Sequence, residues 1–188
     1  MRTPFLLPLF ILALLGAAAA QEQSAPDRVE LFGGYSRPTF SIFDRHSGPW
    51  TRFGYNGFEA SAAFNLMPHL AVEGDFADAF ASPNGNSSSV RTFMGGPRIF
   101  TNIGKATVYG HFLVGGLAFS IGGSGSSYVV AGGGGASLWV SRHIGVRLIQ
   151  FDYLHNGFIP AAVLGYGAGS SGMNNYRFST GIVFRFKN

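Results

Sequence analysis

The last part of the chain alternates between apolar and polar side chains with the two-residue period of a β-strand. Between Tyr176 and Phe186, one face collects large apolar residues and the other carries Arg177 and Arg185. Successive side chains of a strand point to opposite faces, so one face suits lipid and the other is charged. The eleven residues match the roughly 9–11 that a tilted strand needs to cross a bilayer. We predict a transmembrane strand with both arginines inward, because an arginine facing lipid at mid-bilayer costs about 2–4 kcal/mol.

Similar alternation recurs upstream and predicts eight strands in all. The expected strands cover residues 28–35, 55–65, 70–77, 90–100, 107–119, 128–140, 144–154 and 176–186. Short turns are expected at 66–69, 101–105 and 141–143, and longer polar loops at 36–54, 78–89, 120–127 and 155–174. Bacterial barrels have this arrangement, with short periplasmic turns and longer outer loops. The pattern predicts an all-β, eight-stranded antiparallel up-and-down transmembrane β-barrel with both termini periplasmic.

The N-terminus carries the features of a secretory signal. Arg2 precedes a short apolar stretch and the small-residue exit from Ala17 to Ala20. This predicts a cleaved signal peptide over residues 1–20 and an outer-membrane barrel domain over residues 21–188. A membrane helix is the alternative, but the apolar stretch is shorter than about 18 residues and contains Pro8. A chain that crosses a membrane without helices has to close into a barrel, because only closure satisfies every backbone polar group in lipid.

Composition supports this class and excludes others. Charged residues make up 12% of the chain, below the roughly 25% of soluble domains, while 28 glycines and 15% aromatic residues suit lipid-facing strands with Gly/Ser loops. The net charge of +4 is small and not clustered, so no nucleic-acid partner is expected. The chain has no cysteine, which excludes disulfides and thiol chemistry.

The alternation places charges of both signs inside the barrel. The inward candidates are Glu30, Glu59, Glu73, Asp75, Arg98, Asp152, Arg177 and Arg185. Such a set can form an ion path or a carboxylate pair for acid/base catalysis. It can also fill the lumen with ion pairs, since eight strands enclose only enough width for packed side chains. We favour the filled lumen, because buried charges are tolerated only when they are paired.

Two further residues are assigned to faces less directly. In the strand over residues 144–154, Gln150 and Asp152 are best turned inward, which places Arg147 on the outer face. Arg147 could reach the membrane interface there, or a bulge could reverse the register. Trp139, near the third turn, is expected among the interfacial aromatic side chains.

The histidines and glycine runs give weak signals for chemistry. No histidine pair has metal-ligand spacing, and His111 is expected to be a hydrogen-bonded lumen residue. His155 and Asn156 come nearest to the catalytic set of lipid A deacylases, but no serine follows at the spacing those enzymes use. The runs at 122–125 and 132–135 lack the Lys-Ser/Thr ending of a phosphate loop. We expect no catalytic residue, metal or cofactor.

Several segments resemble one known family. They are the opening stretch Val29 to Tyr35, the hairpin from Gly57 to Phe76, the stretch Val146 to Tyr153 and the aromatic final strand. Together they resemble the small eight-stranded outer-membrane barrels of the OmpA/OmpX type and the opacity-protein-like outer membrane protein β-barrel domain. The resemblance implies a barrel over the whole mature chain. It also implies that Phe186 is a recognition signal for the barrel-assembly machinery, although two residues follow it here.

The expected function is that of an integral protein of the bacterial outer membrane with a structural or surface-interaction role. Its surroundings would be outer-membrane lipid and lipopolysaccharide, and the sequence does not specify a partner for the loops. A lipid A-modifying enzyme and a narrow ion channel stay open as alternatives. A soluble lipocalin-like barrel is a further alternative, but it would need its apolar faces inward and these charges outward.

Overall fold

The computed structural model describes residues 29–44, 48–82, 87–121, 124–157 and 173–186. The expected signal peptide at residues 1–20 lies outside these ranges and stays a prediction. The described residues form nine strands: β1 (Val29–Asp44), β2 (Gly48–Gly54), β3 (Asn56–Met67), β4 (Leu70–Ala81), β5 (Ser88–Ile103), β6 (Ala106–Ile121), β7 (Ser124–Trp139), β8 (Ile144–Asn156) and β9 (Met173–Phe186).

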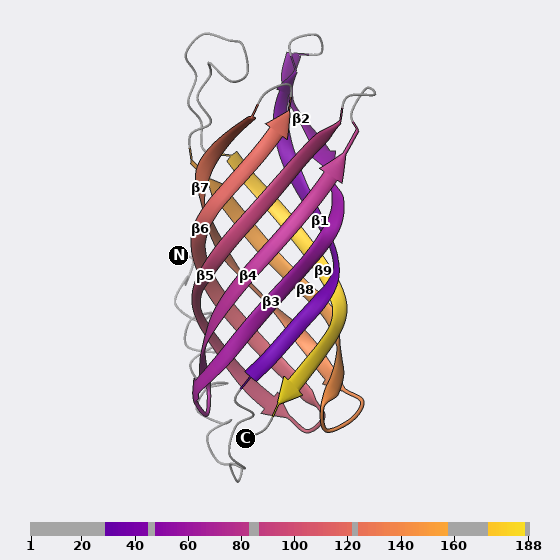
Figure 1. Ribbon diagram of the computed structural model, residues 1–188, viewed down its shortest axis with the longest axis vertical. Coiled ribbons are helices and arrows are strands. Elements are labelled where there is room, and N and C mark those ends of the chain that lie inside the picture. The colour runs from indigo at the N-terminus through magenta and orange to yellow at the C-terminus, as the bar shows by residue number, and fades with distance from the viewer. Residues whose placement is uncertain (1–28, 45–47, 83–86, 122–123, 158–172, 187–188) are drawn as a thin grey trace, which may run out of the picture.

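Eight of these strands form a closed antiparallel barrel (Figure 1). Each strand from β3 to β9 pairs with its neighbours in chain order. The barrel closes where β1 pairs with β3 on one side and with β9 on the other, from Val29 opposite Phe186 to Thr39 opposite Tyr176. The predicted eight-stranded up-and-down barrel is confirmed.

Three short turns lie at one end of the barrel, which we call the turn end. They connect β3 to β4, β5 to β6 and β7 to β8. The second contains Gly104 with φ of 59°, a left-handed conformation that glycine adopts without steric cost. The pairing of Val29 with Phe186 places the first and last described residues at this same end. The opposite end, where β1 connects to β2, β4 to β5, β6 to β7 and β8 to β9, is the loop end.

The predicted loop over residues 36–54 is wrong for most of its length. There β1 continues to Asp44 and pairs with β2 as a hairpin, with Thr39 opposite Gly54. Strands also extend into the expected loops at 78–89 and 120–127. These extensions are rich in Gly, Ser and Pro, so their side chains lack the alternation that marks a membrane-facing strand. Their inner face is still buried in part, as Phe40 and Ala79 show, and pairing with the neighbouring strand continues along them.

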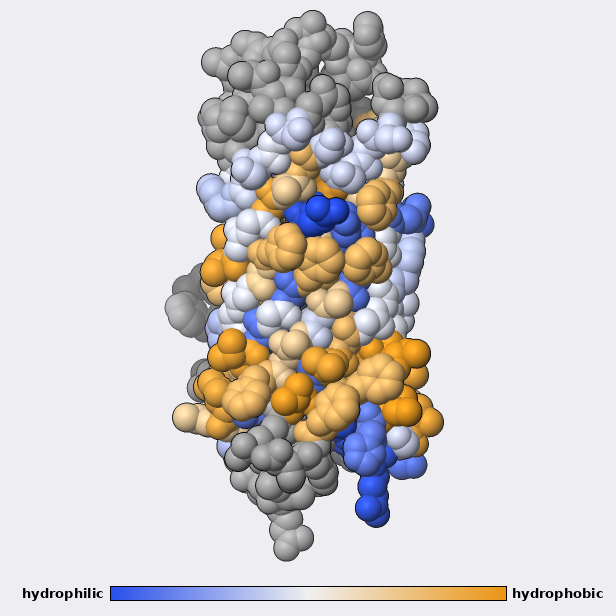
Figure 2. Space-filling view, viewed as in Figure 1, coloured by the Kyte–Doolittle hydropathy of each residue, from blue (hydrophilic) through white to orange (hydrophobic). Residues whose placement is uncertain are grey.

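On the face that Figure 2 shows, hydrophobic side chains gather in bands around the wall, with small and polar residues between them. On β9, Phe178, Ile182 and Phe184 point outward with 41–49% of their surface exposed, while Arg177 is 1% exposed and points into the lumen. Polar side chains inside and apolar side chains outside are the reverse of a soluble barrel and typical of a transmembrane one. Among the described residues, no helix is long and apolar enough to span a membrane.

Candidate functional site: the charged lumen

Arg177 of β9 organises the centre of the lumen. Its Nη1 lies 2.8 Å from Asp75 Oδ1 on β4, and its Nη2 lies 2.7 Å from Asp152 Oδ2 on β8. Its Nε is 3.3 Å from Glu59 Oε2 on β3. An isolated charge in this position would cost several kcal/mol of desolvation, which the three carboxylates offset by direct pairing. One guanidinium therefore links four strands across the lumen.

His111 of β6 lies between two carboxylates. Its Nδ1 is 3.0 Å from Glu73 Oε2, and its Nε2 is 2.8 Å from Asp152 Oδ1. An ionised carboxylate can only accept hydrogen bonds, so each ring nitrogen has to donate one. A neutral imidazole carries a single N–H and satisfies one of these contacts. The geometry therefore assigns the charged imidazolium form to His111, which adds a positive charge to the lumen.

Two arginines share one carboxylate nearer the turn end. Arg98 Nη2 lies 2.8 Å from Glu30 Oε1, and Arg147 Nη2 lies 3.1 Å from the same oxygen. The flat guanidinium groups also cover aromatic rings: Arg98 lies 4.0 Å from the centre of Tyr109 and Arg147 lies 3.9 Å from that of Phe32. Cation–π contacts of this kind stabilise a charge that is removed from water.

Gln150 connects these groups. Its Nε2 donates to Glu59 Oε1 at 2.9 Å and to Asp152 Oδ2 at 2.8 Å. Its Oε1 accepts from Tyr109 Oη and from Arg147 Nη1, both at 2.6 Å. All four hydrogen-bonding positions of the amide are used, and these contacts fix its orientation. The carboxylates around Arg177 and the arginines around Glu30 thus form one network.

Glycines of β7 make room for this network. A Cβ added to Gly133 would lie 2.2 Å from Asp152 Oδ1, and one added to Gly135 would lie 2.7 Å from Tyr109 Oη. Any larger residue would displace a group that holds the network together. The glycine run at 132–135 is therefore a wall segment that lets lumen side chains approach the backbone, which agrees with the expected small-residue strand.

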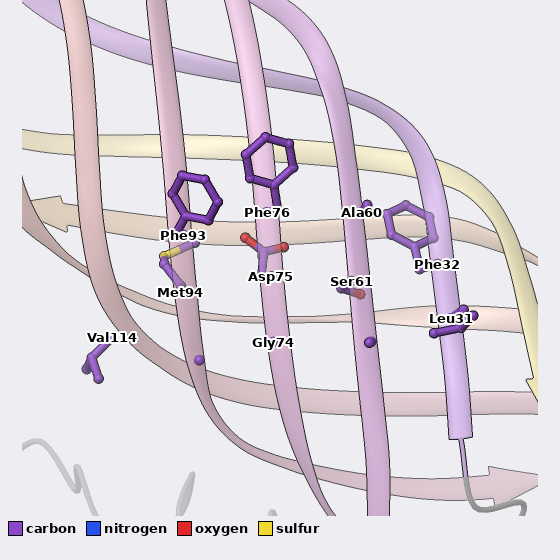
Figure 3. A pocket seen from close by; sticks show the side chains of 12 residues that line it. Leu31, Phe32, Ala60, Ser61, Gly74, Asp75, Phe76, Phe93, Met94 and Val114 are labelled. Carbon is purple, nitrogen blue, oxygen red and sulfur yellow. The ribbon is translucent and has the colours of Figure 1, made fainter.

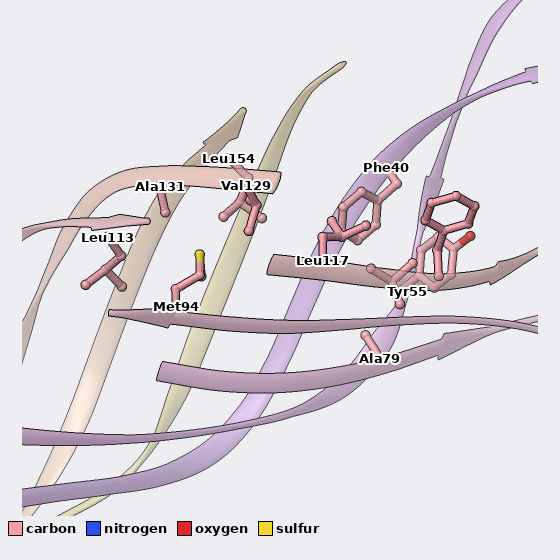
Figure 4. Close-up of a cluster of buried hydrophobic side chains, with 11 residues drawn as sticks. Phe40, Tyr55, Ala79, Met94, Leu113, Leu117, Val129, Ala131 and Leu154 are labelled. Carbon is pink, nitrogen blue, oxygen red and sulfur yellow. The ribbon is translucent and has the colours of Figure 1, made fainter. Parts of the chain in front are cut away.

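A buried apolar cluster fills the lumen between the charged network and the loop end (Figure 4). We call it the upper plug, and it consists of Phe40, Tyr55, Ala79, Val90, Met94, Leu113, Leu117, Phe119, Val129, Ala131 and Leu154. The one polar atom of its Tyr55 side chain is satisfied by a 2.8 Å hydrogen bond with Ser88 Oγ. The plug separates the network from the loop end.

A second group of buried apolar side chains, the lower plug, lies at the turn end. It includes Phe32, Trp139 and Val183, and a neighbouring cluster adds Phe100. The expected interfacial position of Trp139 is wrong: its side chain points inward and its Nε1 donates to Thr107 Oγ1 at 2.8 Å. A polar partner inside the lumen satisfies the indole N–H, so the ring does not need the interface. The charged layer thus lies between two groups of buried apolar side chains. At the turn end, a small cavity of about 30 Å³ that is bordered by Glu30, Arg98 and Arg185 adjoins it.

Solved outer-membrane barrels have a similar structure. The crystal structure of Neisserial surface protein A gives a TM-score of 0.62 at 11% identity, over 84% of this chain and 97% of that one. Ail, the attachment invasion locus protein of Yersinia pestis, gives 0.52 at 16% identity, over 86% and 100%. OprH of P. aeruginosa gives 0.50 at 15% identity, over 84% and 99%. No protein-family model and no curated protein sequence matches the chain.

The chain has the fold of the small eight-stranded outer-membrane barrels. The similarity predicted from the sequence segments is confirmed at the level of the fold. At these identities the likeness extends no further, so the role of the lumen has to be argued from its own side chains.

Within this barrel fold, the charged residues predicted to face inward largely come together. The structure places seven of the eight in the buried network: Glu30, Glu59, Glu73, Asp75, Arg98, Asp152 and Arg177. Arg185 lies at the turn-end mouth instead. Its guanidinium lies 4.0 Å from the centre of Trp139 and donates to the carbonyl oxygen of Arg142 at 2.7 Å.

The outward placement of Arg147 is wrong. Its side chain is fully buried, whereas Leu148 and Ile149 both point outward with more than half of their surface exposed. Around Leu148 the pairing of β8 shifts by one residue against both β7 and β9. This β-bulge reverses the alternation, as one extra residue in a strand must. The reversed register, left open by the sequence, is the one the barrel adopts.

The remaining candidates for chemistry do not form a recognisable centre. Among the described residues, no group of three or more His, Asp or Glu side chains could hold a metal ion. His155 Nδ1 is 2.9 Å from Asn174 Oδ1 at the exposed loop end. Phe186, the predicted assembly signal, ends β9 and points outward with 49% of its surface exposed.

Proposed function

We propose that this protein is an integral outer-membrane barrel with a structural or surface-interaction role and a lumen that does not conduct. One observation carries the proposal: a buried, mutually paired charged layer lies between two apolar plugs, inside a wall whose outer face is apolar. A barrel of this width is filled by its own side chains. Here the charged side chains inside the lumen pair with one another and so link different strands of the wall.

Insertion into a bilayer tests the first half of the proposal. Membranes from cells that produce the protein should retain it through carbonate and urea washes and release it only with detergent. A soluble protein that binds at the surface would leave with the washes. Release of most of the protein without detergent would reject the outer-membrane location.

We further propose that the turn end faces the periplasm and that the loop end faces the outside. The two longest connections, from β4 to β5 and from β8 to β9, and the β1–β2 hairpin lie at the loop end, and bacterial barrels place longer loops outward. This hairpin offers the surface through which a partner would meet the protein. Proteolysis of intact cells should cut at the loop end and spare the barrel. Cuts confined to the turn end would contradict this topology and indicate the opposite orientation.

We assign no catalytic activity to the barrel. Both nitrogens of His111 are engaged by carboxylates, so the ring has no free position from which to activate a nucleophile. Incubation with lipopolysaccharide should leave the masses of the lipid A acyl chains unchanged. A change in mass that the inactive, heat-unfolded protein does not produce would restore the lipid A-modifying alternative.

We propose that Phe186 serves the barrel-assembly machinery. It ends the last strand and its ring is exposed on the outer face, where a partner can reach it before the barrel is released. Phe186→Ala should lower the amount of barrel that reaches the membrane in cells while leaving refolding from urea into detergent unchanged. Loss of refolding to the same degree would instead indicate a packing role.

A further inference from the structure

The outer wall carries a hollow that is lined by residues of β1 and of β3 to β6 (Figure 3). Phe76 and Phe93 are cross-strand partners with ring centres 4.7 Å apart, and they form a shelf. Two residues further towards the turn end, both strands carry glycine, and Gly74 pairs with Gly95. The resulting hollow has a volume of about 720 Å³, and its floor is formed by small residues.

A second hollow meets the first at Phe93. It has a volume of about 480 Å³ and extends over β6 and β7, where Gly116 and Ala118 form its floor. Phe93 lines both hollows and is the cross-strand partner of Gly116. The two hollows therefore adjoin at the phenylalanine shelf, and we call the pair of them the track.

A charged side chain lies at the loop-end start of this track. Arg91 is the cross-strand partner of Ala118, next to the second hollow. It pairs with Asp78 at 2.6 Å, but the carboxylate side chain is 8% exposed and the guanidinium side chain is 51% exposed. Nε and Nη2 each donate to the same Asp78 oxygen, which leaves three guanidinium N–H groups facing outward. The Arg91 guanidinium, and not the Asp78 carboxylate, is therefore the exposed member of the pair on the outer wall.

We propose that this track binds one phosphorylated lipid, with a phosphate on Arg91 and an acyl chain in the hollows. The proposal rests on the membrane location proposed above. A guanidinium recognises phosphate through charge-assisted hydrogen bonds. An arginine on the lipid face is tolerated at the rim of the bilayer, which is the depth of a phosphate group. The small floor residues below it leave the space that a hydrocarbon chain fills.

A second copy of the barrel fits this surface poorly. Two copies that share a membrane orientation keep each residue at the same depth. The Phe76–Phe93 shelf of one copy would then face the shelf of the other, and hollow would face hollow. The phenylalanine shelf of one copy therefore cannot enter the hollow of the other copy, so a lipid is the better occupant.

Glycines offer variants that fill the track without disturbing the wall. A Cβ added to Gly116 or Gly74 meets no atom within 4 Å, and the same holds for Gly132, an outward glycine on β7 away from both hollows. Gly116→Leu and Gly74→Leu therefore block the track, and Gly132→Leu is the matched control. Arg91→Gln removes the phosphate contact and leaves the hollows open.

Native mass spectrometry of the full chain in neutral detergent measures the bound lipid directly. The probes are dimyristoylphosphatidic acid and dimyristoylglycerol, which share their acyl chains and differ only in the phosphate. The unaltered protein should retain one phosphatidic acid with about tenfold preference over the phosphate-free diacylglycerol, as expected for one charge-assisted contact. Arg91→Gln should remove the preference, Gly116→Leu and Gly74→Leu should weaken both lipids, and Gly132→Leu should match the unaltered protein. Excess inorganic phosphate should not displace the lipid.

Equal retention of the two lipids by the unaltered protein, or an unchanged preference in Arg91→Gln, would overturn the proposal. So would displacement by inorganic phosphate, which would indicate an ion site without a chain site. Flotation with phosphatidylcholine vesicles separates this failure from that of the membrane location. If the barrel floats but shows no lipid preference, only the lipid site is rejected. If the barrel does not float, the membrane location is rejected as well.

Discussion

Arg147 and Glu30 are 117 positions apart in the sequence, yet Arg147 Nη2 lies 3.1 Å from Glu30 Oε1 inside the barrel. They come from β8 and β1, which are not neighbouring strands. The contact crosses the lumen, and it exists because the bulge at Leu148 turns Arg147 inward. Breaking a buried pair leaves an uncompensated charge, so cross-lumen pairs of this kind should dominate the effects of substitution.

Arg147→Met should lower the free energy of unfolding by about 3–5 kcal/mol, because Glu30 and Gln150 lose a buried partner. The matched control is Leu148→Met on the adjacent, lipid-facing position, which should change it by less than about 1.5 kcal/mol. Urea titration in lipid vesicles, followed by tryptophan fluorescence, measures both. Equal effects of the two substitutions would show that Arg147 is not held in the lumen.

Arg177→Gln and Arg185→Gln compare two arginines of the same strand. Arg177 contacts three buried carboxylates, so its loss should cost about 3–5 kcal/mol of unfolding free energy or prevent refolding. Arg185 is partly exposed and lies over Trp139 at the mouth, so its loss should cost about 1 kcal/mol or less. Refolding yield on a heat-shift gel ranks the variants even if Arg177→Gln fails to fold. A reversed order would contradict the described network.

Gly133→Ala should destabilise the barrel by about 1–3 kcal/mol, since the new methyl group would lie 2.2 Å from Asp152 Oδ1 and 2.4 Å from the backbone oxygen of Phe151. Gly132→Ala places the same methyl group on the outer face, where no atom lies within 4 Å, and should be close to neutral. The same urea titration distinguishes them. A neutral Gly133→Ala would mean that Asp152 can move aside without loss.

His111 should carry protons on both ring nitrogens at neutral pH, because Glu73 and Asp152 each require a donor. Long-range ¹H–¹⁵N correlation spectra of the refolded protein separate imidazolium from either neutral tautomer, and His111→Gln assigns the signal. A spectrum of a neutral ring would contradict the two-carboxylate geometry.

Much of this architecture could be predicted from the alternation of side chains. The final strand, the hairpin of β3 and β4 and most inward charges follow directly from the two-residue period, because lipid outside and paired charges inside constrain every position. Within the membrane, a residue on the wrong face costs several kcal/mol, so the pattern is strict there. Beyond the membrane that constraint ends, and the β1–β2 hairpin had no such signature.

The other lumen contacts could not be predicted from the sequence of one strand, because they depend on how several strands pair and tilt. The bulge at Leu148 is set by pairing with two neighbours, and it alone decides the face of Arg147. The partners of Arg177 and Glu30 follow from strand tilt, which brings distant positions to one depth. Gln150 and Trp139 acquire their roles only through such partners, although the inward position of Gln150 was predicted.

The central claim is that the paired charged layer and the two plugs together fill the lumen and leave no open path through the barrel. Planar-bilayer recording of the refolded protein tests it most directly, with insertion verified by heat-shift gels on the same preparation. We predict no discrete conductance steps at either polarity. Reproducible steps from the verified, inserted barrel would contradict the closed lumen and favour the narrow channel instead.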